Sequence, residues 1–279
     1  MTSENVHMLS PPIDLLRPIA VTRIPMARDV IFQPKVDGWR ACVFVSAGQV
    51  KIQARSGRLI TASFPELVAA LGALSEGSVI DGEVVCWVSD GQEEPRLDFT
   101  ALSRTPASRR TIQGVVQFLG FDLLCDRGTD IRGLPLSERW PRLLATLNGA
   151  PGRVQPIAST TDRAEAELWA QALVPLGFEG LVAKRLSGAY TQRPSTWWKQ
   201  RYRDTVDGTV VDVVGLSALR LRLDDGREVT TRPLRPAQVH QLADVLAEHG
   251  ETGNPVRVEV QIGTGRHGQV DFVRVRADE

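Results

Sequence analysis

Three strand-like runs follow one another between residues 30 and 54, with only short turns between them. They are Val30–Val36, Trp39–Val45 and Val50–Ala54. The last run alternates apolar and polar residues, as a strand buried on one side does, so we expect Lys51 and Gln53 to point outward. Each turn contains a glycine, which suits a tight reversal. Turns this short leave no room for a helix, and the segment therefore excludes a regular series of βαβ units.

Strands and helices continue in an irregular mixture to about residue 204. Apolar and periodic runs predict strands at Ser78–Val88, Val115–Leu124 and Glu179–Arg185, and helices at Phe64–Leu74, Ser137–Leu147 and Thr161–Leu176. The apolar stripes of the last two helices include Leu144 and Leu168. Cys42, Cys86 and Cys125 lie far apart without another Cys or a His at ligand spacing, and we expect them to be small core residues.

After residue 204 the sequence changes to short alternating strands around one helix. Strands are predicted at Thr209–Val214, Leu219–Leu223, Glu228–Thr231, Val256–Ile262 and Val270–Arg276, with a helix from Pro236 to about His249. Three strands, a helix and two strands is the order of a small OB-fold β-barrel, a fold that often binds nucleic acid. We therefore expect two domains, 1–204 and 205–279.

The charge balance limits the partners that the protein can bind. Lys and Arg total 33 and Asp and Glu total 33, so the net charge is zero, whereas proteins that bind nucleic acid are usually basic. Such a partner would need a local basic patch. No apolar run approaches the roughly 20 residues that span a membrane, and the N-terminus does not resemble a secretory signal. We expect a cytoplasmic protein with no membrane partner.

Lysine is rare in this chain. Only four of the basic residues are lysines, namely Lys35, Lys51, Lys184 and Lys199. Arginine cannot become a neutral nucleophile, whereas a lysine can when its surroundings favour the neutral form. Genome composition would also explain why lysine is scarce, so the context of each lysine has to show whether that lysine has a chemical role. Lys35 precedes the turn Asp37-Gly38, where it is either a partly desolvated nucleophile or the salt-bridged lysine of a surface hairpin.

Acidic residues inside apolar strands are a second indication of a functional site. Asp81 and Glu83 interrupt one predicted strand, and Glu179 begins another. Carboxylates in such positions can hold Mg²⁺ beside substrate phosphates. Lys199 and Arg201 alternate along a strand, so they share one face and could clamp a phosphate. This combination favours phosphoryl chemistry over acid–base hydrolysis.

Six segments of the chain resemble the successive motifs of the covalent nucleotidyltransferase superfamily. They are Lys35-Val36-Asp37-Gly38-Trp39-Arg40, Arg55-Ser56-Gly57, Asp81-Gly82-Glu83, Phe121-Asp122-Leu123-Leu124, Glu179-Gly180-Leu181-Val182-Ala183-Lys184 and Trp197-Trp198-Lys199-Gln200-Arg201. The chain is most similar to small bacterial ATP-dependent DNA ligases. The resemblance implies an α+β fold, with an ATP-grasp-like nucleotidyltransferase (adenylation) domain of antiparallel sheets and helices, followed by the OB-fold barrel.

The resemblance also implies a function, which is the sealing of nicks in duplex DNA through a lysyl-AMP intermediate, with ATP and Mg²⁺ as cofactors. Lys35 would attack the α-phosphorus of ATP and release pyrophosphate. The implied nucleotide contacts are Gln33 at the adenine edge, Phe121 and Val182 against the ring, Arg40 and Arg55 at the ribose and later at the DNA phosphate, Lys199 and Arg201 at the α-phosphate, and Lys184 elsewhere in the same site. Glu83 and Glu179 would bind Mg²⁺ or the ribose.

Three features depart from the family pattern. Gln33 stands where relatives often carry an acid, and Arg201 stands where they usually carry Lys, which keeps the charge but changes the geometry. The C-terminal motif that orients pyrophosphate is matched only loosely, by Arg266-His267-Gly268 and Phe272–Asp278, so we expect slower adenylation. We expect no separate DNA-binding domain ahead of the core, so that encirclement of the duplex would depend on loops or on a partner such as a DNA end-binding or repair protein. We also expect a monomer.

Other interpretations remain open at this point. An RNA ligase or a GTP-using capping enzyme would share the lysine chemistry. An inactive relative would only bind nucleic acid, but the intact lysines and carboxylates of the motifs speak against it. Arg104, Arg109 and Arg110 form a cluster in a polar loop that either contacts DNA or is solvated. Trp197 and Trp198 are neighbours on a strand and point oppositely, so at least one of them is a packing residue.

Overall fold

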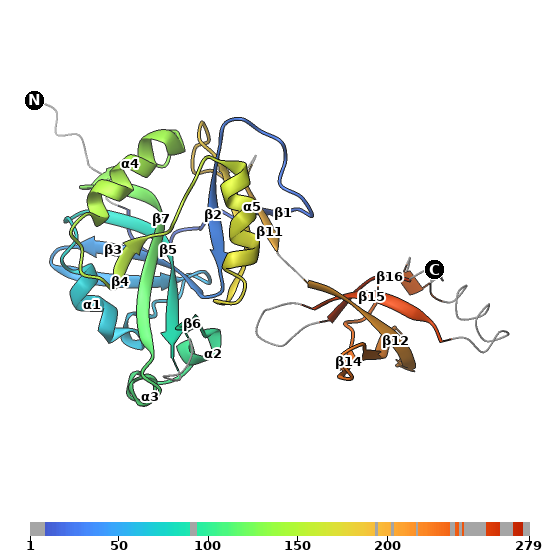
Figure 1. Ribbon diagram of the computed structural model, residues 1–279. Helices are drawn as coiled ribbons and strands as arrows, with labels where there is room; N and C mark the ends of the chain where they lie inside the picture. The colour runs from blue at the N-terminus through green and yellow to red at the C-terminus, as the bar shows by residue number, and fades with distance from the viewer. Residues whose placement is uncertain are drawn as a thin grey trace, which may run out of the picture. The chain divides into compact units, whose positions relative to one another are not determined.

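The computed structural model describes residues 9–89, 94–192, 195–201, 204–215, 217–234, 238–239, 242, 255–262 and 270–275. The chain divides into two units, Met1–Tyr202 and Arg203–Glu279 (Figure 1). Strands predominate in both units, and helices accompany them in the first, so the fold is mixed α+β as expected. Within the described ranges, no helix is long and apolar enough to cross a membrane.

The larger sheet of the first unit has seven strands. Its main order is β4 (Gln49–Ala54), β3 (Trp39–Ser46), β5 (Ser78–Val88), β7 (Val115–Asp126) and β8 (Thr129–Asp130), while β6 (Arg96–Leu97) pairs with β5 and β9 (Val154–Pro156) pairs with β7. All pairs are antiparallel except β7 with β9. The turn Ala47-Gly48 therefore links the antiparallel neighbours β3 and β4, and the turn Asp37-Gly38 leads into β3 from β2 (Val30–Val36), a strand of the other sheet.

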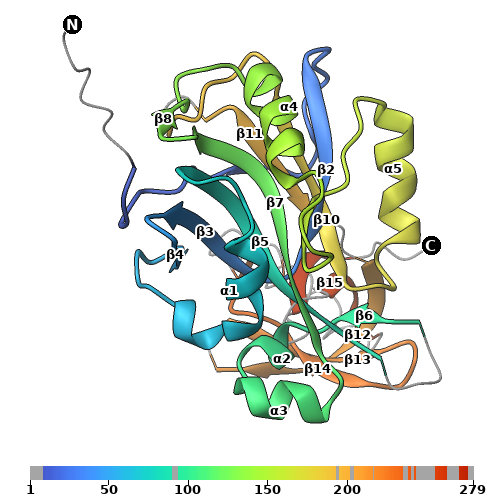
Figure 2. The ribbon, with the colours of Figure 1, turned by 90° about the vertical axis from the view of Figure 1, so that its left-hand side faces the viewer.

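Helices pack on this sheet and complete the main core. Helix α1 (Pro65–Leu71) and helix α4 (Leu136–Leu147) lie across its strands (Figure 2), and their leucines join those of the strands in one cluster. Leu143 and Leu147 of α4 are buried, whereas Leu144 is 40% exposed, so the predicted stripe is wrong at that position. The shorter helices η1 (Thr61–Ser63), α2 (Phe99–Leu102) and α3 (Pro106–Thr111) connect the strands.

The smaller sheet has four strands, in the order β1 (Ile19–Ala20), β11 (Trp197–Arg201), β10 (Phe178–Arg185) and β2 (Val30–Val36). Strand β1 runs parallel to β11, and the other pairs are antiparallel. Helix α5 (Arg163–Ala172) packs on this sheet through Ala166, and Asp162 caps it by accepting a hydrogen bond from the Ala164 backbone N–H. Leu168 is 66% exposed and does not belong to the buried face, contrary to the prediction.

Residues 9–20, which we call the N-terminal strap, run from one sheet to the other. At one end, the side chain of Gln53 on β4 accepts a hydrogen bond from the Ile13 backbone N–H and donates one to the Ile13 carbonyl, at 2.9 and 2.8 Å. At the other end, β1 pairs with β11. Leu15 and Leu16 pack with Cys42 in a separate buried cluster. Gln53 is therefore buried, and the prediction that it points into solvent is wrong because the strap covers that face.

The second unit is one five-stranded antiparallel sheet. Its order is β14 (Glu228–Thr230), β13 (Ala218–Leu223), β12 (Asp204–Val214), β15 (Arg257–Ile262) and β16 (Val270–Val275). A parallel bridge between Thr231 and Val270 joins the two edges of the sheet, and Leu221, Val258 and Phe272 belong to its core. The expected helix near residues 236–249 and the Arg266-His267-Gly268 motif lie almost entirely outside the described residues.

Candidate active site

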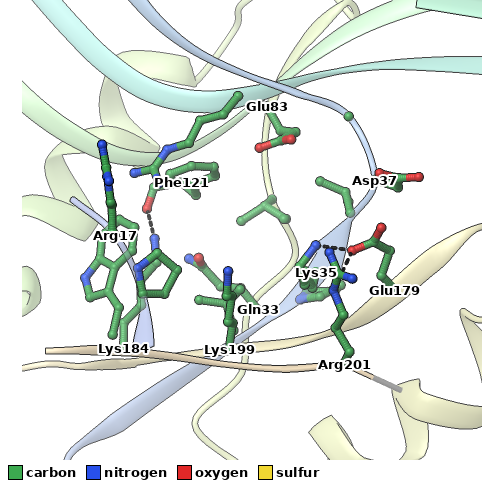
Figure 3. Close-up of a pocket in the computed structure, with 18 of the residues that line it drawn as sticks. Arg17, Gln33, Lys35, Asp37, Glu83, Phe121, Glu179, Lys184, Lys199 and Arg201 are labelled. Atoms are coloured by element: carbon green, nitrogen blue, oxygen red, sulfur yellow. Dashed lines mark hydrogen bonds and ion pairs between the residues drawn. The ribbon is translucent and has the colours of Figure 1, made fainter. Parts of the chain in front are cut away.

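A cavity of about 480 Å³ lies in the first unit, and both sheets contribute to its walls (Figure 3). With the exception of Asp81, every residue that the motifs assign to a nucleotide or metal site lines it, namely Gln33, Lys35, Arg40, Arg55, Glu83, Phe121, Glu179, Val182, Lys184, Lys199 and Arg201. The fold therefore brings the six sequence motifs to one place.

Lys35 lies on β2 opposite Gly180 of β10. Its Nζ forms an ion pair with Oε2 of Glu179, and the same oxygen lies 3.5 Å from Nε of Arg201. The pairing of β2 with β10 is irregular at Glu179. A Cβ on Gly180 would overlap the backbone carbonyl oxygen of Gln200 on β11. Glycine at this position therefore allows three strands to close up around the lysine–glutamate pair.

Two carboxyl groups lie beside this lysine. Asp37 shares a hydrogen bond with Glu179, and burial together with the Glu179 charge raises the pKa of Asp37 to about 7. Burial also acts to raise the pKa of Glu179, but the charge of Lys35 and its hydrogen bond outweigh burial and leave that pKa below its usual value. Glu179 is therefore ionised near neutral pH, and Asp37 is about half protonated. No separate role for Asp37 was expected from its place in the sequence motif.

Glu83 lies on β5 opposite Arg40 of β3. No described residue forms a hydrogen bond or ion pair with its carboxyl group. Burial raises the pKa of Glu83 to about 8, against the opposing charges of Lys35 and Arg40. A Cβ on Gly38 would lie 2.8 Å from Cγ of Glu83 and would overlap the Val84 carbonyl oxygen. Gly38 therefore allows the turn that follows Lys35 to approach the Glu83 carboxylate.

Arg40 is held by a buried hydrogen-bond network. Its guanidinium donates two hydrogen bonds to the Asp81 carboxylate, at 3.1 and 2.6 Å. The Tyr190 hydroxyl donates to the same carboxylate at 2.7 Å and accepts from the Leu16 backbone N–H at 2.9 Å. Asp81 is fully buried and does not line the cavity. The expectation that Asp81 offers oxygens to a metal is therefore wrong, because Arg40 and Tyr190 already use them.

The end of the cavity away from Lys35 is aromatic (Figure 3). The rings of Phe121 and Trp197 meet edge to face, with centroids 5.9 Å apart. Nζ of Lys184 lies 4.4 Å from the Phe121 centroid and 3.8 Å from the Trp197 centroid, and donates a 2.7 Å hydrogen bond to the Phe121 carbonyl oxygen. Burial lowers the pKa of Lys184 to about 7. Of the two neighbouring tryptophans, of which at least one was expected to be a packing residue, Trp197 lines the cavity and Trp198 does not.

Gln33 lies between these two ends, on β2 opposite Val182 of β10. Its side chain is buried, and its Nε2 has no hydrogen-bond partner among the residues that the structure describes. A buried donor without a partner costs about 1–3 kcal/mol. Because Gln33 lines the cavity, a ligand with an acceptor at this place would remove that cost. A carboxamide is well suited to a base edge, since it offers both a donor and an acceptor.

Basic side chains surround the rest of the cavity. Lys199 and Arg201 of β11 line it together, and burial with the charges of Lys35, Arg201 and Arg55 lowers the pKa of Lys199. Arg17 of the N-terminal strap also lines it. Arg17 lies in none of the sequence motifs, so its place at the cavity was not predicted. Clustered cations of this kind attract an anionic ligand such as a polyphosphate.

The carboxylates fit a shared magnesium site. The described residues contain no group of three or more His, Cys, Asp or Glu side chains that could hold a metal ion. Mg²⁺ usually takes only one or two protein carboxylates and completes its shell with substrate phosphates and water. Glu83 and Glu179 line one cavity, and Glu83 has no partner in the described part of the chain. These residues therefore suit Mg²⁺ that binds together with a phosphorylated ligand.

The arginine cluster around residue 109 lies elsewhere. Arg109 is 1% exposed. It donates to the Glu66 carboxylate at 2.8 Å and to the Ser63 carbonyl oxygen at 2.6 Å. Both expectations for this residue, DNA contact and solvation, are wrong, because Arg109 joins α3 to α1. Arg104 and Arg110 are exposed.

Known proteins with similar sequences are DNA ligases. Residues 17–201 match the family described as ATP dependent DNA ligase domain. DNA ligase C2 of Mycolicibacterium smegmatis is 33% identical over 232 residues, which are 77% of this chain and 64% of the relative. DNA ligase C of Mycobacterium tuberculosis is 32% identical over 237 residues, which are 78% and 64% of the two chains. The chain thus spans about 64% of the length of these two relatives.

Solved structures show the same fold. The ligase domain of M. tuberculosis LigD superposes with a TM-score of 0.56 and 22% identity over 95% of this chain and 96% of that chain. A Lig E DNA ligase gives a TM-score of 0.59 and 16% identity over 95% of this chain and 100% of that chain. The family match covers more than half of the sequence and includes both sheets of the cavity. The chain therefore belongs to the ATP-dependent DNA ligase domain family.

Proposed function

We propose that the chain is an ATP-dependent DNA ligase, which seals nicks with a 5′-phosphate and a 3′-OH through a lysyl-AMP intermediate. The observation that carries this proposal is the position of Lys35. It contacts Glu179 at one end of a cavity that also presents Lys199 and Arg201 (Figure 3). The names of the relatives DNA ligase C2 and DNA ligase C support the same reaction.

The adenine would enter the aromatic end of the cavity. Phe121 lies at this end, Val182 lines the cavity opposite Gln33, and the two would contact the faces of the ring. The unpartnered amide of Gln33 would bind its polar edge. Arg40, which Asp81 fixes in place, would contact the ribose. The base would then sit away from Lys35, and the phosphates would extend toward it.

Lys35 would be the nucleophile of the first step. Its neutral Nζ attacks the α-phosphorus, a P–N bond forms, and pyrophosphate leaves. Glu179 contacts this nitrogen and is positioned to accept its proton. Lys199 and Arg201 are cations in the same cavity, and they would stabilise the charge that develops on the α-phosphate.

We propose Mg²⁺ as the second cofactor, held by Glu83 and Glu179. When bound, it would neutralise part of the phosphate charge and make the phosphorus more electrophilic. Both carboxylates line the nucleotide cavity. Asp81 is excluded from this role, because its oxygens are occupied by Arg40 and Tyr190.

Two further transfers would complete the reaction. A 5′-phosphate oxygen of the nick attacks the phosphorus of the bound AMP, the P–N bond breaks, and Lys35 regains its proton. The 3′-OH then attacks the 5′-phosphorus, and AMP leaves as the phosphodiester forms. Arg40 and Arg55 line the mouth that the nucleotide cavity shares with a neighbouring hollow, which suits the proposed contact with the DNA phosphate.

We also propose that the second unit is an OB-fold domain, with its boundary at 204/205. The strand order and the bridge between Thr231 and Val270 support a closed sheet. The substrate of the whole protein would be nicked duplex DNA. The protein would act as a monomer in the cytoplasm, with help from a DNA end-binding or repair protein. A relative named multifunctional non-homologous end joining protein LigD, from Pseudomonas aeruginosa, supports an end-joining role; it is 35% identical over 168 residues, which are 60% of this chain and 19% of that protein.

The test is covalent labelling with α-labelled ATP and Mg²⁺, followed by denaturation. The wild-type chain should keep the label, and Lys35→Arg should abolish it, because arginine keeps the charge but is not a nucleophile. Lys51→Arg is the matched control, since Lys51 is exposed on β4 and should not affect labelling.

Three results would contradict parts of the proposal. A fully labelled Lys35→Arg variant would mean that another residue is the nucleophile. Label from GTP instead of ATP would indicate a capping-type enzyme. Sealing of nicked RNA alone, with no sealing of a nicked DNA duplex, would indicate an RNA ligase.

A further inference from the structure

A second hollow adjoins the nucleotide cavity. It is more open, has a volume of about 450 Å³, and is lined by Arg17, Trp39, Arg40, Ala54, Arg55 and Ser56. Arg17, Arg40 and Arg55 line both spaces, so they form the boundary between them. The described lining of the second hollow contains no acidic side chain. Its chemistry is therefore that of an anion site.

Two of the three arginines are free to bind an anion. The charge of Arg40 is already balanced by the buried Asp81 carboxylate. Arg17 and Arg55 are exposed, and neither side chain has an ion-pair or hydrogen-bond partner among the described residues. A phosphate placed between two such guanidinium groups would receive charge-assisted hydrogen bonds from both.

The backbone of Arg17 is fixed, although its side chain is free. The backbone N–H of Arg17 donates to the Gln192 side chain at 3.2 Å, and the Ser195 hydroxyl donates to the Arg17 carbonyl at 3.1 Å. The preceding residue, Leu16, is buried and bonded to Tyr190. The N-terminal strap thus holds the backbone of Arg17 in place, so that only the side chain has to be ordered when an anion binds.

The position of Arg17 indicates which phosphate it can reach. Lys35 must contact the α-phosphorus, and it lies at the opposite end of the nucleotide cavity from Arg17, which is beside Phe121 and Lys184 (Figure 3). Lys35 does not line the second hollow. The phosphates of a nucleotide that is set for attack by Lys35 would therefore lie away from Arg17.

We propose that Arg17 is a further DNA-binding residue, which contacts a backbone phosphate of the DNA strand in the second hollow beside Arg55. The inference rests on the proposed ligase function and assigns a new residue to it. Trp39 and Ser56 complete the lining of this hollow. Because Arg40 is shared with the nucleotide cavity, the strand phosphate would lie directly beside the bound AMP.

The test compares full-length Arg17→Gln, Arg17→Lys and Arg58→Gln. Arg58 is exposed near Arg55 and lines neither space, so Arg58→Gln removes an equal charge outside the proposed subsite. Binding of a nicked duplex is measured by fluorescence anisotropy over a range of salt concentrations. Adduct formation is measured with α-labelled ATP, and thermal melting checks that each variant is folded.

Arg17→Gln should weaken binding of the nicked duplex by about tenfold, as expected for one charge-assisted contact. It should also reduce the slope of log affinity against log salt by about 0.9, since one phosphate contact is lost. Arg17→Lys should keep most of that slope, and Arg58→Gln should keep both affinity and slope. The effect of Arg17→Gln on adduct formation should be much smaller than its effect on DNA binding.

Two results would overturn the proposal. Equal losses in Arg17→Gln and Arg58→Gln would mean that Arg17 contributes only general surface charge. A loss in adduct formation as large as the loss in DNA binding would mean that Arg17 binds the nucleotide. A wild-type chain that forms no adduct would contradict the proposed function instead, and the anisotropy measurement would still report on the subsite.

Discussion

Replacing Lys184 by Met should change how the stability of the protein depends on pH. Burial lowers the pKa of Lys184 from 10.5 to about 7, whereas in the unfolded chain this lysine titrates near 10.5. Between these two values the unfolded chain binds more protons than the folded one, so stability rises with pH. The penalty for burying the charge is fully present below pH 7 and disappears as the pH approaches 10.5.

The shift gives the size of the effect. A difference of 3.5 pH units corresponds to a penalty of about 5 kcal/mol at low pH, at about 1.4 kcal/mol per unit. Integrated over both titrations, the penalty is about 4.7 kcal/mol at pH 6 and about 2 kcal/mol at pH 9. Methionine is unbranched, fills similar space and carries no charge. The stability difference between wild type and Lys184→Met should therefore change by about 2–3 kcal/mol between the two pH values.

Urea denaturation at several pH values measures this change. Packing differences between lysine and methionine do not depend on pH, so they cancel when the two stability curves are compared. Lys51→Met is the control, because Lys51 is exposed on β4 and its curve should stay parallel to that of the wild type. A Lys184→Met curve that also stays parallel would refute the claim that the ammonium is desolvated between Phe121 and Trp197.

Two other substitutions test the supports of the site. Tyr190→Phe removes a hydroxyl that donates to Asp81 and accepts from the Leu16 N–H. Urea denaturation should therefore show that the free energy of unfolding falls by about 2–4 kcal/mol. An unchanged free energy of unfolding would argue that Tyr190 does not hold the N-terminal strap. Gly38→Ala places a Cβ against Glu83 and the Val84 carbonyl. This overpacking should lower the free energy of unfolding by about 1–3 kcal/mol and sharply reduce adduct formation. Full labelling of the variant with α-labelled ATP would count against the close approach of the Gly38 turn to Glu83.

Local sequence signals predicted most elements of the fold. Strand β5 begins at Ser78 and ends at Val88, as its run of apolar residues predicts, and helix α5 lies within the predicted range Thr161–Leu176. These features depend on neighbouring residues, which a sequence pattern records directly. The predicted bounds of the elements were less accurate. Helix α5, for example, ends at Ala172 and not at Leu176.

Long-range contacts could not be predicted in this way. The N-terminal strap has no periodic pattern, so nothing in the sequence indicated that it would cover Gln53 or place Arg17 at the cavity. Arg109 stands in a polar stretch, and only the folded chain brings Glu66 to it. Asp81 was found as an unusual acid in a strand, but its use by Arg40 depends on the pairing of β3 with β5. Each of these errors concerns a partner that is distant in sequence.

The surroundings of Lys35, Lys184 and Lys199 explain why these three positions carry lysine and not arginine. Lys184 sits between two rings and donates one hydrogen bond to a carbonyl oxygen, and a guanidinium with five N–H donors would leave several donors unsatisfied there. Lys35 must lose a proton to act as the proposed nucleophile, which arginine cannot do. Lys199, whose pKa is lowered by burial and neighbouring cations, faces the same cavity as a compact charge. Genome composition can explain why arginine is used elsewhere, but it does not explain why three of the four lysines line one cavity.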